Sequence, residues 1–369
     1  MLYIHQSFCI SPQQADDLDT LRPSRDNQLF VLDPPYPDIP PGLLRRMGKA
    51  VKISVGAALP LLKSQAVPDG IIMGTGNGGL EDCIRFLDQI IQYDEGMLTP
   101  ANFVQSTANA MASQISLLSR NHAYNITHVH RGLAFEQALL DAWMLAEEHP
   151  AKTFLLGGAD EISSYNNNIE TLSGSFKMES TENAHLYDST TPGSLAGEGA
   201  ALFRVSGQPA AQTAPDAQTA RQTAPDTQTA PQPAPAANAR DTAPIAVKAL
   251  DTLHTRDSSV VRARLADFVA RHGVPDLLLT GENGDSRLTS FYTVAEETLG
   301  VPVARFKHMT GEYPTAGAAG LWLAEGILRN GRMPAHMTKS GETKGLRSIL
   351  LYNTFKGLQH SFILVLRII

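Results

Sequence analysis

The sequence has few of the features that mark secreted, membrane or nucleic-acid-binding proteins. Only two cysteines occur in 369 residues, Cys9 and Cys83, and their wide separation favours unpaired thiols in a reducing compartment. No apolar stretch approaches the roughly 18 residues that cross a bilayer. Residues 1–11 lack the basic and apolar regions of a signal peptide and instead predict a first strand. We therefore expect a cytoplasmic protein without a membrane span.

An excess of positive charge is also missing. The net charge is −7, whereas general nucleic-acid binders usually carry a basic stripe, so no nucleic-acid partner is predicted. Hydrophobic residues make up 43% of the chain and charged residues 18%, which is typical of soluble globular proteins. A chain of this length can bury a large core, and we expect neither a metal nor a cofactor.

One segment differs in composition from the rest. Residues 207–242 are rich in Pro, Ala, Gln and Thr, and they contain Gln-Thr-Ala-Pro-Asp twice, at 212–216 and 222–226. This composition cannot bury apolar surface, and its prolines remove backbone donors, so it predicts a disordered, partly extended insertion. The insertion could be a tolerated surface loop or a binding motif. It separates two ordered parts, 1–206 and 243–369.

Short apolar runs alternate with helical periods in both ordered parts. The pattern predicts strands at 70–74, 153–156, 200–205, 276–280, 349–352 and 361–369, and helices at 80–92, 101–119, 289–299 and 316–329. Such alternation is typical of an α/β protein with a covered, mostly buried sheet.

Residues 124–161 carry the most informative pattern. A short strand at 125–127 leads into a sharp turn at 128–132 and a helix of about 14 residues, and the next strand ends in Gly-Gly-Ala-Asp-Glu. Strand, tight turn and helix together form an elbow. In enzymes such an elbow holds a nucleophile at the helix N-terminus, where the helix dipole favours a thiolate.

This layout resembles that of the β-ketoacyl synthases, whose elbow reads Ala-Cys-x-x-Gly and whose later strand ends in Gly-Gly-x-Glu. Further segments resemble family landmarks in the expected order: 74–79 (Gly-Thr-Gly-Asn-Gly-Gly), 197–200 (Gly-Glu-Gly-Ala), 307–312 with 318–320, and 353–358. The resemblance implies the thiolase-type α/β fold, in which two pseudo-duplicated α/β halves form an αβαβα layered sandwich. The halves would correspond to 1–206 and 243–369.

Several segments also resemble the short ketosynthase-like proteins of aryl polyene and flexirubin pigment clusters. They are 103–107 with 112–115, 129–132 with 135–136, and 307–315. This closer resemblance implies a place in a fatty-acid or polyketide-type pathway of the aryl polyene kind.

The positions that match the ketosynthase catalytic residues carry other side chains. When Gly132 is set on the elbow glycine, Val129 stands where the family has its cysteine. The loop at 280–284 has neither the first histidine nor its usual spacing, and Glu312 replaces the second, so that only Lys307 remains. A ketosynthase needs a thiol to carry the acyl group and two imidazoles to assist decarboxylation. The resemblance therefore implies a protein that does not condense acyl chains.

The replacements at the elbow are charged. His130 and Arg131 stand at the start of the central helix, where positive charge opposes the dipole unless a carboxylate compensates it. Glu312 is the natural candidate, because it replaces a family histidine that faces the elbow. We therefore predict a polar cluster of His130, Arg131, Glu312 and Lys307, with His308 as a further candidate.

Two interpretations of this cluster remain open. His130 and Glu312 could act with Lys307 as general base and acid on a thioester. Alternatively, the salt bridges could fill the space left by a lost active site. The residues expected to contact substrate are Arg131, Phe135, His308 and Phe355.

Three functions follow from the resemblance. The first is a non-condensing, chain-length-factor-like or scaffold partner of an active ketosynthase, present as a homodimer or as a heterodimer with that synthase, and binding an acyl carrier protein. The second is an acyl-thioester hydrolase or acyltransferase that uses His130 and Glu312. The third is an ordinary condensing enzyme, which requires that Val129 is not the nucleophile position.

Overall fold

The computed structural model describes residues 1–369 except 38, 64–65, 77, 210–242 and 369. The insertion predicted at 207–242 therefore lies almost wholly outside the described residues, and its disorder stays a prediction. Across the part of the chain that the structure describes, no helix is both long and apolar enough to cross a membrane.

The chain alternates strands and helices from end to end. The strands of the main sheet are β1 (Leu2–Ile10), β3 (Gly70–Thr75), β4 (Tyr124–Val129), β5 (Thr153–Asp160), β7 (Gly199–Ser206), β8 (Ile245–His254), β9 (Leu277–Thr280), β10 (Val303–Arg305), β11 (Thr338–Ser340), β12 (Ser348–Phe355) and β13 (Gln359–Arg367). The longer helices are α2 (Lys49–Lys63), α3 (Leu80–Gln92), α5 (Ala110–Ser119), α6 (Ala134–Glu148), α7 (Ser164–Leu172), α8 (Ser258–His272), α9 (Thr289–Leu299) and α11 (Ala316–Asn330). The short elements include α1 (Pro41–Leu44), α4 (Pro100–Gln105), α10 (Lys307–Thr310), and β2 (Gln28–Leu29) paired with β6 (Ala196–Gly197).

The main sheet consists of two copies of one topology. Its order is β11-β10-β9-β12-β13-β8-β1-β7-β5-β3-β4. The edge strand β11 is extra; without it each half contributes five strands. Counted in chain order, the five strands of both halves run first, fifth, fourth, second, third from the centre outward. The pairing senses match as well, with two antiparallel contacts followed by two parallel ones. The halves meet where β1 pairs antiparallel with β8.

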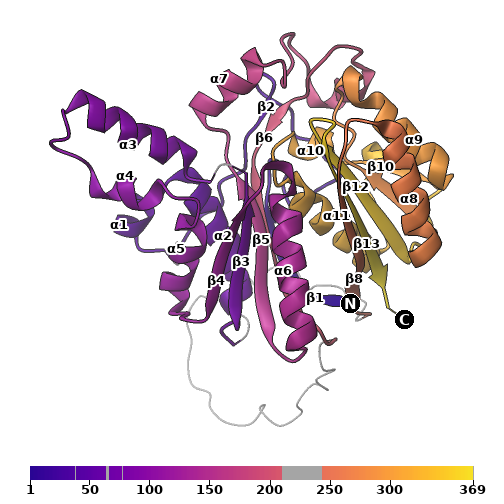
Figure 1. The fold of residues 1–369 in the computed structure, drawn as a ribbon, viewed down its shortest axis with the longest axis horizontal. Helices are drawn as coiled ribbons and strands as arrows, with labels where there is room; N and C mark the ends of the chain where they lie inside the picture. Colours follow the sequence, from indigo (N-terminus) through magenta and orange to yellow (C-terminus); the bar gives the residue numbers. More distant parts are fainter. Residues whose placement is uncertain (38, 64–65, 77, 210–242, 369) are drawn as a thin grey trace, which may run out of the picture.

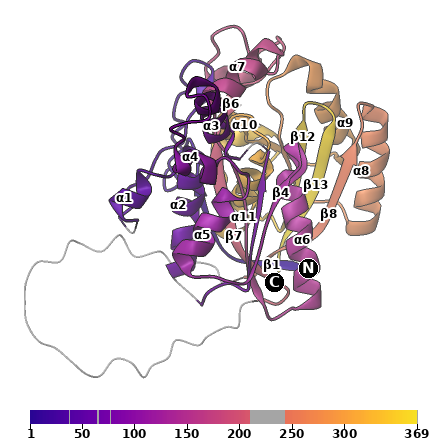
Figure 2. The same ribbon diagram turned by 60° about the vertical axis from the view of Figure 1, so that its left-hand side comes forward.

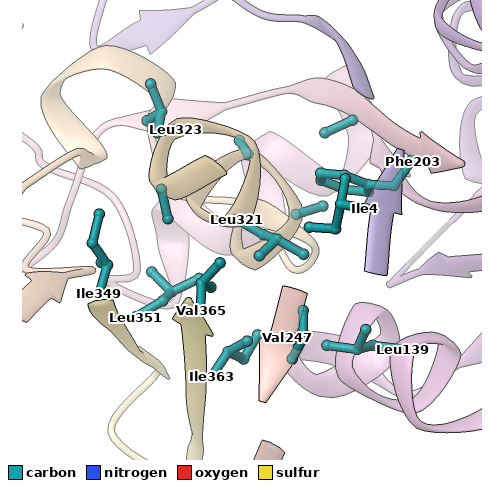
Figure 3. Packing of buried hydrophobic residues seen from close by; sticks show 14 of the residues in the cluster. Ile4, Leu139, Phe203, Val247, Leu321, Leu323, Ile349, Leu351, Ile363 and Val365 are labelled. Carbon is teal, nitrogen blue, oxygen red and sulfur yellow. The ribbon is translucent and has the colours of Figure 1, made fainter. Parts of the chain in front are cut away.

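Helices fill the layers between and outside these halves. α6 packs on β3 and β5 but also reaches β8, and α11 packs on β12 and β13 but also reaches β5 and β7. Figures 1 and 2 show α2 and α5 on one outer face and α8 and α9 on the opposite one. The central layer is the largest core, in which side chains such as Phe203, Leu321 and Ile363 interdigitate (Figure 3). The predicted layered α/β sandwich is confirmed.

Several expected elements have different bounds, and two of them have a clear physical reason. The helix expected at 101–119 is broken into α4 and α5 at 106–109, where the sequence is Ser-Thr-Ala-Asn. Ser, Thr and Asn compete for backbone hydrogen bonds and so favour helix ends over helix interiors. The apolar run at 153–156 extends through the Gly-Gly-Ala-Asp segment, so that β5 ends at Asp160, because Gly157 and Gly158 continue the pairing with both β3 and β7.

Candidate functional site

The predicted elbow lies between β4 and α6. A single 3₁₀ turn, η1 (Arg131–Leu133), joins them, and a Cβ placed on Gly132 would lie 2.1 Å from the Cβ of Phe355. Only glycine therefore fits at this position. The Gly132 amide donates a hydrogen bond of 2.9 Å to Oε1 of Gln359. Arg131 has φ of 50°, a left-handed conformation that costs an L-residue roughly 1–2 kcal/mol.

A cavity of about 740 Å³ opens beside this turn. Both halves of the chain line it, and its walls include Arg131, Glu161, Asn283, Glu312 and Phe355. Val129 ends β4 with its side chain 56% exposed, and the residue of the turn that faces the cavity is Arg131. The lining is mostly polar, with an apolar part around Phe355.

Lys307 and Glu312 form a buried ion pair at the inner wall of the cavity. The Lys307 side chain is fully buried, and its Nζ lies 2.7 Å from Oε1 of Glu312. Asn283 Nδ2 donates to the other carboxylate oxygen at 2.8 Å. The structure thus brings together two predicted site residues and adds Asn283, which was not predicted. The dipeptide Asn283-Gly284, in the loop compared with the family's His-Gly, was the signal available in the sequence.

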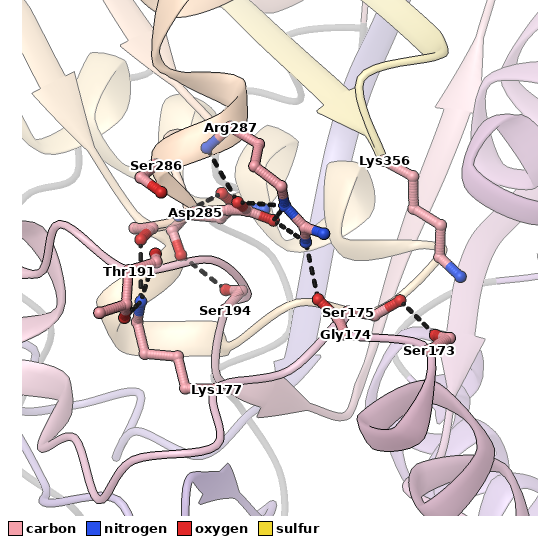
Figure 4. A network of polar contacts seen from close by, with 12 residues as sticks. Ser173, Gly174, Ser175, Lys177, Thr191, Ser194, Asp285, Ser286, Arg287 and Lys356 are labelled. Atoms are coloured by element: carbon pink, nitrogen blue, oxygen red, sulfur yellow. Dashed lines mark hydrogen bonds and ion pairs between the residues drawn. The ribbon is translucent and has the colours of Figure 1, made fainter.

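The loop that carries Asn283 is anchored by a polar network (Figure 4). The Lys177 ammonium, 2% exposed, donates to the carbonyl oxygens of Thr191 at 3.1 Å and Gly284 at 3.0 Å. Ser194 Oγ donates to the Asn283 carbonyl at 2.7 Å. Burial lowers the pKa of Lys177, and the Coulomb attraction of nearby carboxylates partly opposes this shift. These bonds fix the position from which Asn283 reaches Glu312.

Arg287 holds the far side of the same loop. Its guanidinium lies 2.6 Å from the Asp285 carboxylate and donates to the Gly174 carbonyl at 2.7 Å. Although burial alone would raise it, the hydrogen bonds from Arg287 lower the pKa of Asp285. The loop is therefore tied to the α7 segment by a pair that stays charged.

A second buried carboxyl group, Glu136 of α6, lies close enough to Lys307 to interact with its charge. Its side chain is 1% exposed and accepts a 2.8 Å hydrogen bond from Ser361 Oγ. Its other oxygen, Oε2, has no hydrogen-bond partner among the described residues. Burial raises the pKa of Glu136 to about 7, although Ser361 and the Lys307 charge oppose the shift. The carboxyl group therefore sits near the midpoint of its titration at neutral pH.

His130 does not join the predicted cluster. Its side chain is exposed, its Nδ1 lies 3.3 Å from Nε2 of Gln359, and its ring lies 5.7 Å from that of His254. The carboxylate of Glu312 is instead occupied by Lys307 and Asn283. The expected His130–Glu312 pair is therefore replaced by two separate sets of contacts.

His308 also lies apart, although it follows Lys307 directly. Its Nδ1 lies 3.0 Å from the Tyr187 hydroxyl and its Nε2 lies 2.8 Å from Nδ1 of His336. Burial lowers the pKa of His308 to about 3, with smaller contributions from His336 and Arg305. This imidazole is therefore neutral at physiological pH. It belongs to a hydrogen-bonded chain of side chains, Tyr187, His308 and His336, outside the cavity lining.

Of the residues expected to contact substrate, Arg131 and Phe355 line the cavity. Phe135 instead packs in the central core, with its ring centroid 6.0 Å from that of Phe203. The two thiols lie elsewhere. Cys9 is buried on β1, where burial raises its pKa to about 12, and Cys83 lies on α3.

The duplicated sheet topology, the elbow before α6 and the Lys307 loop agree with the thiolase-type fold expected from the resemblance. Residues 22–171 match the family model described as "Beta-ketoacyl synthase, N-terminal domain". The predicted resemblance to the β-ketoacyl synthases is thereby confirmed. Comparison with curated protein sequences gave no match.

Solved structures of ketosynthases share the fold along the whole chain. A β-ketoacyl synthase from Burkholderia phymatum STM815 is 15% identical with a TM-score of 0.71, and the match covers 100% of this chain and 99% of that one. The ketosynthase ApeO in complex with its chain length factor ApeC, from Xenorhabdus doucetiae, gives 12% identity, a TM-score of 0.72 and coverage of 99% and 98%. The AntDE:AntF complex, a type II PKS acyl-carrier protein with its ketosynthase, is 12% identical with a TM-score of 0.67, and the match covers 100% of this chain and 99% of that one. At these identities the similarity shows the fold.

Proposed function

We propose that this chain is a non-condensing ketosynthase homologue that acts as a chain-length-factor-like partner of an active ketosynthase. Its pathway would be of the fatty-acid or polyketide type, of the aryl polyene kind. The observation that carries the proposal is that neither thiol of the chain, Cys9 or Cys83, lines the cavity. In the match that sets Gly132 on the family's elbow glycine, Val129 takes the position of the nucleophile.

The inner wall of the cavity supports the same proposal. Condensation requires donors that stabilise negative charge developing on a carbonyl oxygen. Here the wall presents Glu312, a carboxylate, and the nearby Lys307 is already paired with it. The Gly132 amide at the start of the central helix is likewise occupied, by Gln359. These groups are better suited to holding a fixed cavity shape than to binding an oxyanion.

An acyl-thioester hydrolase or acyltransferase that uses His130 and Glu312 is less well supported. The two side chains would have to act on one substrate, but each makes its own contacts, with Gln359 and His254 in one case and with Lys307 and Asn283 in the other.

We expect the purified protein to neither turn over nor become acylated by thioesters. The intact chain would be incubated with acyl-carrier-protein and acyl-CoA thioesters and with cerulenin, and then followed by product analysis and intact mass. An active ketosynthase is the positive control, and a Cys83→Ser variant removes the more exposed of the two thiols. Turnover by the protein alone, or a cerulenin adduct that survives in Cys83→Ser, would contradict the proposal.

The open edge of β4 supports a partner subunit at this side of the molecule. Among the described residues β4 pairs with β3 alone, and it carries neither lysine nor proline, the residues that commonly protect an exposed edge. Large apolar side chains flank it: Tyr124 and Val129 on the strand, and Leu140 and Met144 on α6. We propose that a second subunit of the same fold, either another copy or an active ketosynthase, covers this edge, and that the assembled pair binds the acyl carrier protein.

We expect Met144→Glu to disrupt this assembly while the isolated chain stays folded. The Met144 side chain is 56% exposed in the single chain, so the added charge stays solvated there but would be desolvated in an interface. Co-purification from the native cell, with the ketosynthase identified by mass spectrometry, and light scattering of the pure protein measure the effect. We expect association at least about tenfold weaker, because burying an unpaired charge costs more than 1.4 kcal/mol.

Val274→Glu is the matched control, since Val274 is 64% exposed but follows α8 in the other half. If both variants retain the partner, this face is not the interface. If both lose it, the effect of Met144→Glu is not specific to the β4 edge.

A further inference from the structure

The acidic side chains that line the cavity are nearly all compensated. Glu312 pairs with Lys307, Asp285 with Arg287, and Glu170 with Lys356. Asp160 accepts hydrogen bonds from the amides of Gly76 and Thr315 and from two hydroxyl groups. Burial, the largest effect on Glu161, raises its pKa to about 7 and so reduces its charge. The cavity therefore has little unbalanced negative charge.

Two guanidinium groups in the lining are not compensated. Arg131 and Arg256 both line the cavity, and neither guanidinium group has a hydrogen bond or an ion pair with any residue that the structure describes. The two residues belong to opposite halves of the chain, Arg131 to the elbow and Arg256 to the segment between β8 and α8. The cavity thus has unmatched positive charge from both halves of the chain.

The position of Arg131 is costly in two ways. Its backbone is left-handed, with φ of 50°, and it stands at the N-terminal end of η1 and α6, where positive charge opposes the helix dipole. A carboxylate from elsewhere in the chain could offset the second cost, but Glu312 is committed to Lys307 and Asn283. An external anion would offset it in the same way.

An apolar surface lies directly beside Arg131. The ring of Phe355 lies against Gly132, and Leu288 and Phe291 lie against Gly357, two residues further along the same turn. All three apolar side chains line the cavity. A ligand that reaches Arg131 therefore has hydrocarbon or aromatic surface to cover next to its charged end.

We propose that the cavity binds an organic carboxylate without forming a covalent bond. The carboxylate contacts Arg131 and Arg256, and a hydrocarbon or aromatic body lies along Phe355, Leu288 and Phe291. Guanidinium groups bind carboxylates through paired, charge-assisted hydrogen bonds, which makes them suited to this recognition. The inference rests on the proposed function in one respect, namely that no acyl-enzyme forms at the elbow.

Calorimetric titration of the intact protein tests the assignment. The probes are cinnamate and octanoate, their neutral amides, and inorganic phosphate. We expect the acids to bind at least about tenfold more tightly than the amides, since a charge-assisted hydrogen bond is roughly twice as strong as a neutral one and this difference corresponds to about tenfold in affinity. Arg131→Gln and Arg256→Gln should each weaken the binding of the acids at least about tenfold. Arg131→Lys should retain part of the affinity because it retains the charge.

Arg347→Gln is the matched control, because Arg347 is an exposed arginine away from the cavity. Thermal unfolding of each variant separates lost binding from lost folding. The proposal is overturned if acids and amides bind equally, if the double variant Arg131→Gln/Arg256→Gln binds like the wild type, or if phosphate alone binds as tightly as the acids.

These titrations use the isolated chain with no thioester and no partner. Thioester turnover would therefore contradict the proposed function while leaving carboxylate binding measurable. Conversely, equal binding of acids and amides would overturn this inference without bearing on the proposed non-condensing function.

Discussion

Replacing Glu312 with alanine should destabilise the protein by about 3–5 kcal/mol, the range seen when one partner of a buried ion pair is removed. The Lys307 side chain is fully buried and forms an ion pair with Glu312. Without Glu312, the Lys307 ammonium group would remain in the protein interior. The nearby carboxyl group of Glu136 would compensate it poorly, because burial favours the neutral form of Glu136. The free energy of unfolding, measured by urea denaturation of wild type and variant at pH 7, reports the difference.

Two companion variants separate charge from packing. Glu312→Gln keeps the side-chain volume and an oxygen acceptor for Lys307, so we expect a smaller loss than with alanine. The double variant Lys307→Met/Glu312→Gln removes both charges and should recover most of the stability, because apolar replacement of a buried ion pair is often neutral or favourable. A loss below about 1 kcal/mol for Glu312→Ala would mean that water or another group solvates Lys307.

The sequence predicted those elements whose local pattern agrees with their tertiary surroundings. α3 has the bounds expected from its apolar period, and β3 and β9 differ from expectation by one residue. α2 was not predicted, and its interior contains both Gly56 and Pro60, residues that normally weaken a helix. A Cβ at Gly56 would lie 2.4 Å from the Tyr36 ring. Packing therefore requires a glycine that helix propensity disfavours, and no local rule contains that information.

The candidate site shows the same division between local and distant information. Lys307 and Glu312 are five residues apart, and their pairing could be predicted from the sequence. The bonds from Asn283 to Glu312, Ser361 to Glu136, and Gly132 to Gln359 join segments that are far apart in the chain. The dipole argument required a partner at the elbow but could not identify it. The turn is held by an amide, Gln359, rather than by the carboxylate that was expected.

The stability of the Glu136→Gln variant should depend on pH in a defined direction. Burial raises the pKa of Glu136 from its ordinary 4.5 to about 7, so the folded state binds a proton that the unfolded state has released. Between these two values the wild type loses stability as the pH rises, and above about pH 7 the penalty is fully developed. The difference amounts to roughly 3 kcal/mol, since one pKa unit corresponds to about 1.36 kcal/mol.

Glutamine is neutral at every pH and keeps an acceptor for Ser361, so it removes the titration and little else. We therefore expect Glu136→Gln to match the wild type near pH 4.5 and to exceed it in unfolding free energy by up to roughly 3 kcal/mol at pH 8. Glu148→Gln, an exposed change on the same helix, should show no such divergence. If the unfolding free energies of the wild type and Glu136→Gln differ by the same amount at every pH from 4.5 to 8, Glu136 titrates alike in the folded and unfolded states. Its burial beside Lys307 would then be fully compensated by that charge, and Lys307 would serve two carboxylates rather than one.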